Sequence, residues 1–164
     1  SCVVCNSASK SFNTAGLQTA NIVCADEAKR SLIDRAINDN EVCDVNPFGI
    51  VGLIAAYNEG EEWFEALKDY IWHNYLIARD CLAEALPAFK VTPLEGTYLM
   101  WINCAPTGMD SDEICRRLEE EGRVLLNPGT MYGQGGEQFI RLNLACPESV
   151  LREGLRRIVS VLSK

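Results

Sequence analysis

Residues 7–17 have the sequence Ser-Ala-Ser-Lys-Ser-Phe-Asn-Thr-Ala-Gly-Leu, which places Lys10 in a polar loop directly after a strand-like segment, residues 2–5. In α/β folds, ligands bind at the carboxyl ends of strands. The hydroxyls of Ser7 and Ser9 are suited to binding an anion, and a partly desolvated lysine has a lowered pKa and acts as a nucleophile. On composition alone, a solvated surface lysine in a serine-rich loop is the more common explanation.

Two further motifs are similar to known sites but lack the context that those sites need. Ser7-x-x-Lys10 has the spacing of serine β-lactamases and penicillin-binding proteins, yet the sequence has neither a Ser-Asp-Asn nor a Lys-Thr-Gly partner motif. Gly133-Gln-Gly-Gly136 is similar to a phosphate-binding loop, but it precedes a strand-like segment and not a helix. We therefore expect a lid or a turn at residues 133–136.

Arg141 lies in the middle of the apolar segment Gln138-Phe-Ile-Arg-Leu-Asn-Leu144, which has the pattern of a strand. Burying an unpaired guanidinium is expensive, so this side chain is expected to meet an anion. A carboxylate fits the parallel N–H donors of the guanidinium. An internal salt bridge and a strand face open to solvent remain as alternatives.

The composition is that of a globular protein with a substantial core. The 164 residues include 15 Lys and Arg against 23 Asp and Glu, a formal net charge of -8, and 48% are hydrophobic. An acidic chain lacks the basic face that nucleic-acid binding requires. Because no apolar run approaches about 18 residues, we expect no membrane-spanning segment.

The eight cysteines do not indicate a disulfide scaffold, which is typical of small, loop-rich secreted domains. Cys81 and Cys115 lie in helical patterns, where cysteine behaves as a small hydrophobic residue. Cys2-x-x-Cys5 has the spacing of half a zinc site, but no second pair follows and the only histidine is His73. We expect no metal site, and we expect the reducing cytoplasm as the location.

The first 60 residues predict two strands and two helices. Residues 2–5 are expected to form a short buried strand and residues 19–24 a second strand. Asp26 is a suitable N-cap for a helix that runs to about residue 39. Asn46-Pro47 begins an apolar helix that ends at Gly60. The side chains of this helix that we expect to be mostly buried are Phe48, Val51, Leu53, Ile54 and Ala55.

One long helix is predicted for residues 61–86, because Phe64, Ile71 and Ala78 recur at seven-residue intervals and Pro87 ends the pattern. At 1.5 Å per residue the helix spans about 39 Å. A helix of that length exceeds the core of one small domain, so it is expected to connect two domains. A single long helix in a bundle is the alternative.

After Pro87 the pattern alternates between strands and helices. We expect strands at residues 96–103, 124–126 and 138–144. Asp110 and Glu113 form an Asp-led variant of the capping box, with Gly122 as the residue that ends this helix. Pro147 opens the last helix. This order suits a small α+β unit with helices on one face of a sheet.

Taken together, these motifs resemble the class I/II aminotransferase-like family, the fold-type I enzymes that use pyridoxal 5′-phosphate (PLP). Residues 7–17 are similar to its lysine loop. Residues 93–101, with Pro-Leu-Glu-Gly-Thr-Tyr-Leu-Met-Trp, and residues 128–136, with Pro-Gly-x-x-Tyr-Gly-x-x-Gly, resemble its C-terminal domain, as does Arg141-Leu-Asn. The Ser-Lys-Ser-Phe-Asn and Glu-Gly-Thr-Tyr-Leu-x-Trp forms look most like the cystathionine β-lyase (C–S lyase) branch.

The resemblance implies a role for four residues. Lys10 would be the catalytic lysine, forming the Schiff base with PLP and acting as general base. Ser7 and Ser9 would bind the cofactor phosphate, and Arg141 would bind the substrate α-carboxylate. The chain departs from many aminotransferases at Gln18, where they carry an arginine eight residues after the lysine. Phosphate binding would then depend on hydroxyls, backbone N–H groups and residues outside this chain.

The resemblance also implies an α/β fold class, with the chain as the C-terminal part of a fold-type I enzyme. Residues 1–60 would be the end of the large PLP-binding domain, residues 61–86 the interdomain helix, and residues 87–164 the small α+β domain. Members run to roughly twice this length, so we expect an upstream part that holds the pyridinium-binding Asp. The isolated chain is then expected to be inactive, and a homodimer is implied by analogy.

The activity implied is that of a C–S β-lyase, which cleaves cystathionine or cysteine conjugates to a thiol, pyruvate and ammonia. An aminotransferase, which passes an amino group from an amino acid to a 2-oxo acid, would use Lys10 and Arg141 in the same way. A third alternative is a regulatory protein with this fold and no turnover. In each case the partner is a small amino acid, and neither nucleic acid nor a membrane.

Overall fold

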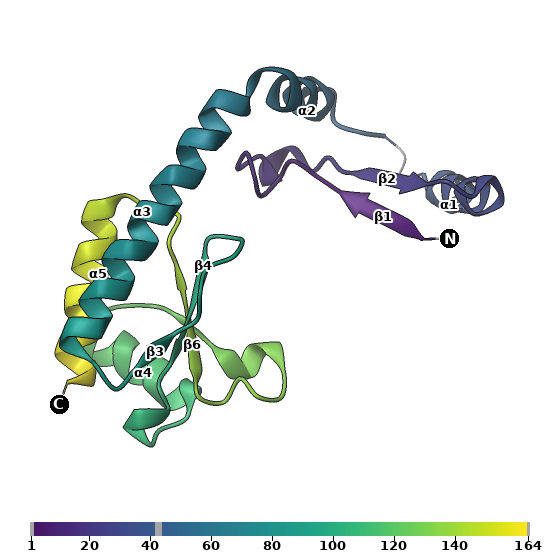
Figure 1. Cartoon of the computed structure of the whole chain (residues 1–164). Helices are drawn as coiled ribbons and strands as arrows, with labels where there is room; N and C mark the ends of the chain where they lie inside the picture. Colours follow the sequence, from purple (N-terminus) through teal and green to yellow (C-terminus); the bar gives the residue numbers. More distant parts are fainter. Residues whose placement is uncertain (1, 42–43, 164) are drawn as a thin grey trace. The chain divides into compact units, whose positions relative to one another are not determined.

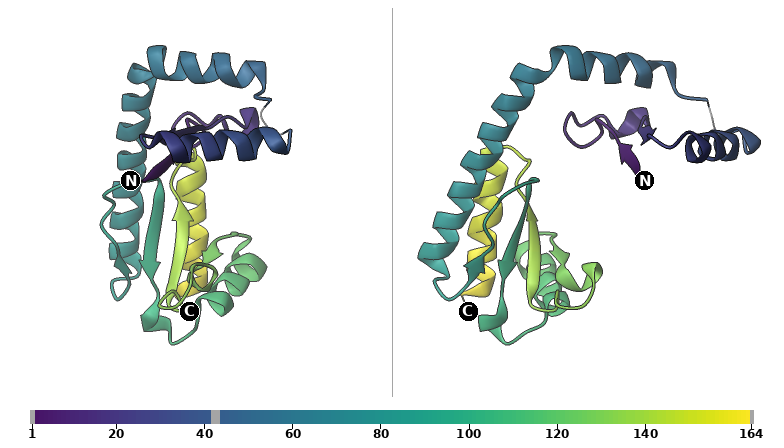
Figure 2. Two further views of the ribbon diagram at one scale, coloured as in Figure 1. Left: turned by 90° about the vertical axis from the view of Figure 1, so that its right-hand side faces the viewer. Right: turned by 45° about the vertical axis from the view of Figure 1, so that its right-hand side comes forward.

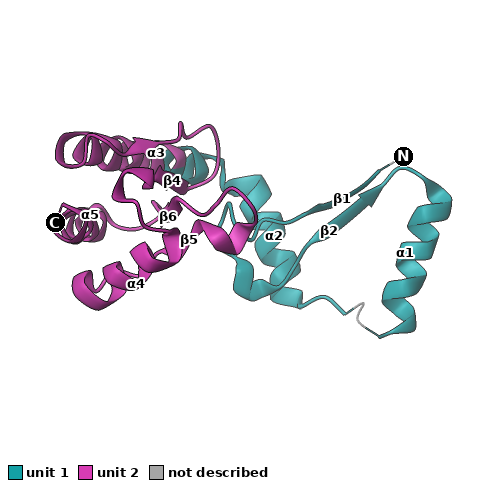
Figure 3. Cartoon of the chain, turned by 90° about the horizontal axis from the view of Figure 1, so that it is seen from below, with its two compact units in different colours: residues 1–67 teal, residues 68–164 magenta. Residues whose placement is uncertain are grey.

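The computed structural model describes residues 2–41 and 44–163, and the chain divides into two compact units, residues 1–67 and 68–164 (Figure 3). Helices and small antiparallel sheets alternate along the chain (Figure 1). This agrees with the predicted mixed α/β class. The predicted division into residues 1–60, 61–86 and 87–164 stays a prediction.

The first unit is built on a two-stranded antiparallel ribbon. Strand β1 pairs with β2, with Val3 opposite Cys24. Asp26 caps the following helix as predicted, because its carboxylate accepts a hydrogen bond from Lys29 N. The elements of this unit are β1 (Val3–Asn6), η1 (Ala15–Leu17), β2 (Asn21–Cys24), α1 (Glu27–Asp39), α2 (Pro47–Glu59) and the first residues of α3 (Glu61–Ala85).

The predicted burial of this unit is wrong. All four residues of β1 are exposed, because in the described part of the chain β1 pairs only with β2. In α2, Phe48 is 78% exposed and Val51 67% exposed. The only buried residue of α2 is Gly49. Helix α2 therefore makes its closest contacts through small residues, and its large apolar side chains are exposed or only partly buried.

The second unit holds most of the core around a four-stranded antiparallel sheet of order β3-β4-β6-β5. In register, Trp101 of β4 lies opposite Arg141 of β6, and Arg141 lies opposite Asn127 of β5. The elements are β3 (Lys90–Val91), β4 (Leu99–Asn103), η2 (Ala105–Thr107), α4 (Ser111–Gly122), β5 (Asn127–Pro128), η3 (Gly129–Tyr132), β6 (Phe139–Asn143) and α5 (Glu148–Leu162).

Side chains alternate between the two faces of this sheet. Met100, Ile102, Ile140 and Leu142 are buried on one face, whereas the residues between them are only partly buried. Helices α4 and α5 pack against each other and supply further core residues, including Ile114, Leu118 and Leu155. Helix α3 runs beside α5, as Figure 1 and Figure 2 show. Arg141 and Trp101 thus lie on the face opposite the buried one.

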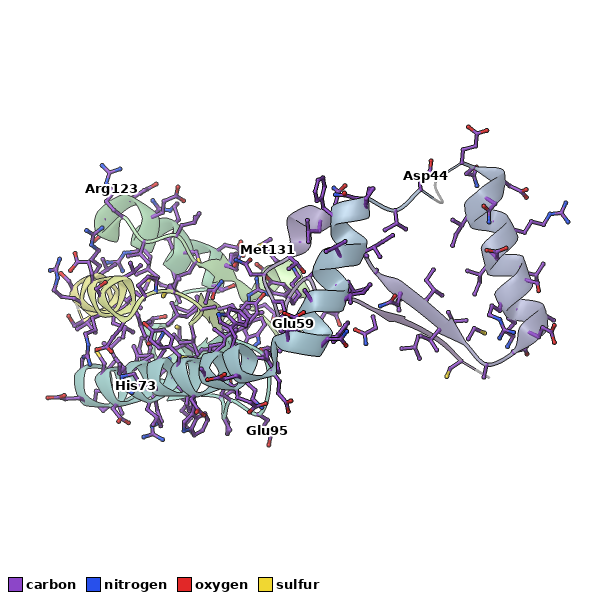
Figure 4. The ribbon with its side chains drawn as sticks, turned by 90° about the horizontal axis from the view of Figure 1, so that it is seen from above. Asp44, Glu59, His73, Glu95, Arg123 and Met131 are labelled. Atoms are coloured by element: carbon purple, nitrogen blue, oxygen red, sulfur yellow. The ribbon has the colours of Figure 1, made fainter. Side chains whose placement is uncertain are left out.

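Two predictions in this unit are corrected. Helix α4 includes Gly122, and the capping residue is Arg123 in the left-handed region, at the end of the helix (Figure 4). A Cβ on Gly122 would lie 3.1 Å from Val161 Cγ2, so this glycine marks the close approach of α4 and α5. The strand predicted at residues 124–126 is instead Asn127–Pro128, because those residues pair with β6.

The remaining boundaries follow the predictions closely. Asp110 accepts a hydrogen bond from Glu113 N and caps α4. Pro147 precedes α5, and α3 ends at Ala85, before Pro87. None of the helices in the described ranges is long and apolar enough to cross a membrane.

Candidate active site

Lys10 lies in a tight turn that follows β1. Phe12 N donates to Ala8 O over 2.9 Å, and Thr14 N donates to Ser9 O over 3.0 Å, so the chain coils back on both sides of the lysine. Lys10 is exposed, and no carboxylate in the described part of the chain pairs with its amine. The described residues thus do not supply the partial desolvation that the sequence suggested.

The hydroxyls of Ser7 and Ser9 form a donor pair beside this lysine. Ser7 Oγ donates to Ser9 Oγ over 2.8 Å and accepts from Ser9 N over 3.3 Å. This arrangement uses the hydroxyl hydrogen of Ser7 and leaves that of Ser9 to donate elsewhere. A phosphate oxygen fits such a donor. Gln18, with a φ of 51°, is exposed and adds no charge.

Phe12 anchors the turn, a feature that the sequence interpretation missed. Its ring lies 5.9 Å from that of Trp63 in a stacked arrangement and 5.5 Å from that of Phe64. A Cβ on Gly60 would lie 2.5 Å from Phe12 Cε1, so the glycine makes room for this ring. The signal in the sequence was an aromatic residue two positions after the lysine, which we assigned no role.

Helix α2 supports the other end of the loop through two glycines. A Cβ on Gly49 would lie 1.9 Å from Thr19 Oγ1, and one on Gly52 would lie 2.7 Å from Leu17 Cδ1. A Cβ at either position would require Thr19 or the Leu17 side chain to move, so the two glycines permit this close packing. The segment from Lys10 to Thr19 is thus fixed at both ends by contacts within the first unit.

Arg141, in the second unit, is held by a neutral amide and an aromatic ring. Its Nη2 donates to Asn127 Oδ1 over 3.2 Å, and its Cζ lies 4.4 Å from the centroid of the Tyr132 ring. Its Nε is buried and has no hydrogen-bond partner. Since none of the ion pairs among the described residues involves Arg141, its positive charge is uncompensated there, and the alternative of an internal salt bridge is not formed among those residues.

An aromatic pocket of about 250 Å³ is lined in part by Tyr132, the ring that also contacts Arg141. Trp101, Tyr132 and Phe139 line it together with the glycine-rich turn at residues 133–136. The ring of Trp101 lies edge-on to that of Tyr132 at 5.3 Å. Residues 133–136 form a turn, as predicted, and Gly133 and Gly135 have φ of 111° and 91°. Asn127 and Tyr132 are the contacts of Arg141 that the sequence interpretation missed.

The described part of the chain forms neither a metal site nor a reactive-cysteine site. No group of three or more His, Cys, Asp or Glu residues there is placed to hold a metal ion. The described cysteines are free, and Cys43 lies outside the described residues. Burial raises the pKa of the Cys104 thiol to about 12 and that of Cys115 to about 11. These two thiols stay protonated near neutral pH and are poor nucleophiles.

Comparison with known proteins places these features in one family. The model of the family "Aminotransferase class I and II" matches residues 1–158. The chain is 38% identical over 161 residues to cystathionine beta-lyase PatB of Bacillus subtilis and 37% identical over 163 residues to cystathionine beta-lyase of Corynebacterium glutamicum. Both alignments cover 98% of this chain and 42% of the relative, so the chain spans less than half the length of these proteins.

A solved structure gives the same result. Cystalysin from Treponema denticola, which contains a pyridoxal 5′-phosphate cofactor, superposes with a TM-score of 0.93 at 27% identity, over 98% of this chain and 41% of that protein. The fold-type I class predicted from the sequence is therefore confirmed.

Proposed function

The chain belongs to the aminotransferase class I and II family, and on this premise we propose that it carries the lysine and the carboxylate-binding arginine of a PLP-dependent C–S β-lyase. The observation that carries the proposal is the uncompensated charge of Arg141, with its buried and unpartnered Nε, in a chain 38% identical to a cystathionine beta-lyase. A buried guanidinium donor without a partner costs free energy, which a bound carboxylate would recover.

The residues of the first unit fit PLP. Lys10 has an exposed amine that no described carboxylate neutralises, and the Ser9 hydroxyl is free to donate to a phosphate oxygen while Ser7 orients it. We propose that Lys10 holds the cofactor covalently and that Ser7 and Ser9 bind its phosphate. When bound, PLP supplies an electron sink for the charge that develops at the substrate Cα.

In the proposed reaction, the residues of this chain bind the substrate and move one proton. Arg141 binds the α-carboxylate of the amino acid through paired N–H donors. Lys10 Nζ would accept the proton from Cα as general base. The Cα–H bond breaks, the Cβ–S bond breaks, and the sulfur leaves as a thiolate. Water then hydrolyses the three-carbon remainder to pyruvate and ammonia.

Aminotransferase activity is the alternative that the family name supports. In that reaction Lys10 would return the proton to the cofactor side, and no C–S bond would break. The described residues serve both reactions. The two cystathionine beta-lyase relatives favour the lyase.

The test uses the full-length, PLP-loaded protein that contains this chain, with cystathionine or cysteine as substrate. We expect release of pyruvate, ammonia and a thiol. Stoichiometric formation of pyridoxamine phosphate without pyruvate would replace the lyase by the aminotransferase. Bound PLP with neither product would support the regulatory role. Lys10→Ala is expected to abolish the linkage to PLP that borohydride reduces, and a surviving linkage would refute the role of Lys10.

We further propose that the whole protein is a cytoplasmic homodimer, and that residues 1–60, 61–86 and 87–164 are the end of its large domain, the interdomain helix and its small domain. The free cysteines of the described residues support a reducing location. Light scattering of the full-length protein tests the dimer, since a monomer at micromolar concentration would contradict it.

A further inference from the structure

Asn127 is the side chain that holds the guanidinium of Arg141. It lies on β5 directly opposite Arg141 of β6 and accepts a hydrogen bond from Arg141 Nη2 over 3.2 Å. A guanidinium can only donate, so the amide of Asn127 must present its oxygen. Because the two residues are partners in the sheet register, the contact depends on the backbone pairing as well as on the two side chains.

The chemistry of this partner is informative. Structural arginines that are partly buried are usually paired with a carboxylate, which neutralises their charge. Asn127 has the shape of Asp and accepts the same hydrogen bond, but it carries no charge. The ring of Tyr132 supports the other side of the guanidinium at 4.4 Å, again without a formal charge. Arg141 is therefore oriented and remains cationic.

The orientation leaves one edge of the guanidinium available. Nη2 gives one of its two hydrogens to Asn127, whereas the buried Nε has no hydrogen-bond partner, so Nε and the second hydrogen of Nη2 form one edge. A carboxylate binds an arginine through two adjacent N–H groups, and an edge that includes Nε offers such a pair. An acidic residue at position 127 would instead pair with Arg141 from within the sheet and compete with any incoming carboxylate.

We propose that Asn127 is a positioning residue that holds Arg141 in the orientation for a substrate carboxylate while keeping its charge uncompensated, so that the neutral amide at this position determines selectivity for α-carboxylate substrates. This inference rests on the proposed function, because it takes Arg141 as the carboxylate-binding residue.

The experiment compares Asn127→Asp and Asn127→Ala in the full-length, PLP-loaded protein. For cysteine, we expect KM to rise about tenfold in Asn127→Ala, which loses a hydrogen bond to a charged group, with kcat changed by less than about twofold. We expect a larger rise, about a hundredfold, in Asn127→Asp, where the new carboxylate occupies the arginine. A residue with a purely structural role would give the opposite order, because Asp keeps the shape and the hydrogen bond that Ala lacks.

Gln138→Glu is the matched control. Gln138 is exposed, lies three residues before Arg141 in the chain, and the change adds the same single negative charge. Its KM is expected to stay within about twofold of the wild-type value, since an exposed charge is screened by salt. Urea unfolding of each variant provides a second readout. Asn127→Asp is expected to be as stable as the wild type or more stable, because it gains an ion pair.

A binding measurement separates this inference from the proposed reaction. Calorimetry with propionate, a carboxylate without an amine or a sulfur, measures the arginine site directly. If the wild type lacks lyase activity but Asn127→Asp still loses propionate affinity, the proposed function fails and the inference stands. If the wild type releases pyruvate while Asn127→Asp keeps its KM and its propionate affinity, the inference is overturned and the function stands.

Discussion

Asn74 offers a sensitive test of how the second unit is held together. This residue of α3 is 0% exposed, and its Nδ2 donates to Leu144 O and to Cys146 O, both over 2.9 Å. It thereby fastens the turn between β6 and α5, three residues after Arg141, to the long helix. Its Oδ1 is buried without a partner, so the amide is present for its two donors alone.

Replacing Asn74 by Asp should lower the free energy of unfolding by an amount that depends on pH. The acid has no second donor, and its ionised form would face two carbonyl oxygens in a buried site. Burial therefore raises the pKa of the new carboxyl in the folded state, whereas in the unfolded chain it titrates at about 3.9. Between these values the folded state binds more protons, so stability falls as pH rises and levels off above the raised pKa.

The magnitude follows from the contacts. Losing one of two hydrogen bonds costs about 1 kcal/mol near pH 4, where the acid is protonated. If burial raises the pKa by about three, ionisation adds about 4 kcal/mol by pH 8. The loss for Asn74→Ala is about 2 kcal/mol at either pH, because Leu144 O keeps a second hydrogen bond from Cys146 N.

Urea unfolding followed by tryptophan fluorescence measures these values, since Trp72 and Trp101 both lie in the second unit. Asn143→Asp is the matched control. Asn143 is exposed, and its side-chain oxygen accepts a hydrogen bond from Ala145 N, which a carboxylate can also accept. An Asn74→Asp penalty that is the same at pH 4 and pH 8, or below about 1 kcal/mol at pH 8, would refute the reasoning.

Three further predictions test other parts of the second unit. Gly129→Ala should disrupt the turn that follows β5 and lower the midpoint of urea unfolding, because the new Cβ would lie 2.1 Å from Gly136 O. Gly154→Ala in α5 is the control, because its Cβ would meet nothing within 4 Å, and it should stabilise the protein by about 1 kcal/mol. Cys104 should resist a thiol reagent at pH 8 until the protein unfolds, since burial raises its pKa to about 12. Mass spectrometry measures this, and a labelled Cys104 in the native protein would contradict the prediction. Glu153 should titrate at about 2 by NMR, because hydrogen bonds from Arg156 and Arg157 lower its pKa. Any stability that it contributes is present above the ordinary value and is lost progressively as pH falls from there through about 2. A titration midpoint above 4 would contradict those contacts.

The helix ends could be predicted from the sequence because their causes are local. Asp26 and Asp110 accept hydrogen bonds from backbone N–H groups three residues ahead, so a short stretch of sequence contains the whole interaction. Gly122 shows the limit of this reasoning. Its position suited a residue that ends a helix, but it is small because Val161 of another helix lies against it. Only the tertiary packing distinguishes these two uses of glycine.

The prediction of burial in the first unit was wrong for a related reason. The apolar residues of α2 predict a buried helix, yet hydrophobicity does not specify which side chains meet a neighbour. Gly49 and Gly52 provide the close contact with Leu17 and Thr19, and the described chain places the branched side chains elsewhere. A pattern based on apolar residues gives most weight to the largest side chains, whereas here the contact is made by the smallest.

The candidate site also contains residues that the sequence could identify and residues that only the tertiary structure reveals. Lys10, Ser7 and Ser9 were identifiable because they are adjacent in sequence and chemically distinctive. Asn127 was not, because it precedes Pro128 in what looks like an ordinary turn and lies 14 residues from its partner Arg141. Its role comes from the sheet register, and a shift by one residue would turn its side chain to the other face. The relevant property of the amide is that it carries no negative charge. Replacing its Nδ2 group with an oxygen would keep the hydrogen bond and remove the free charge, so the selectivity of the arginine depends on a difference that no local sequence pattern reports.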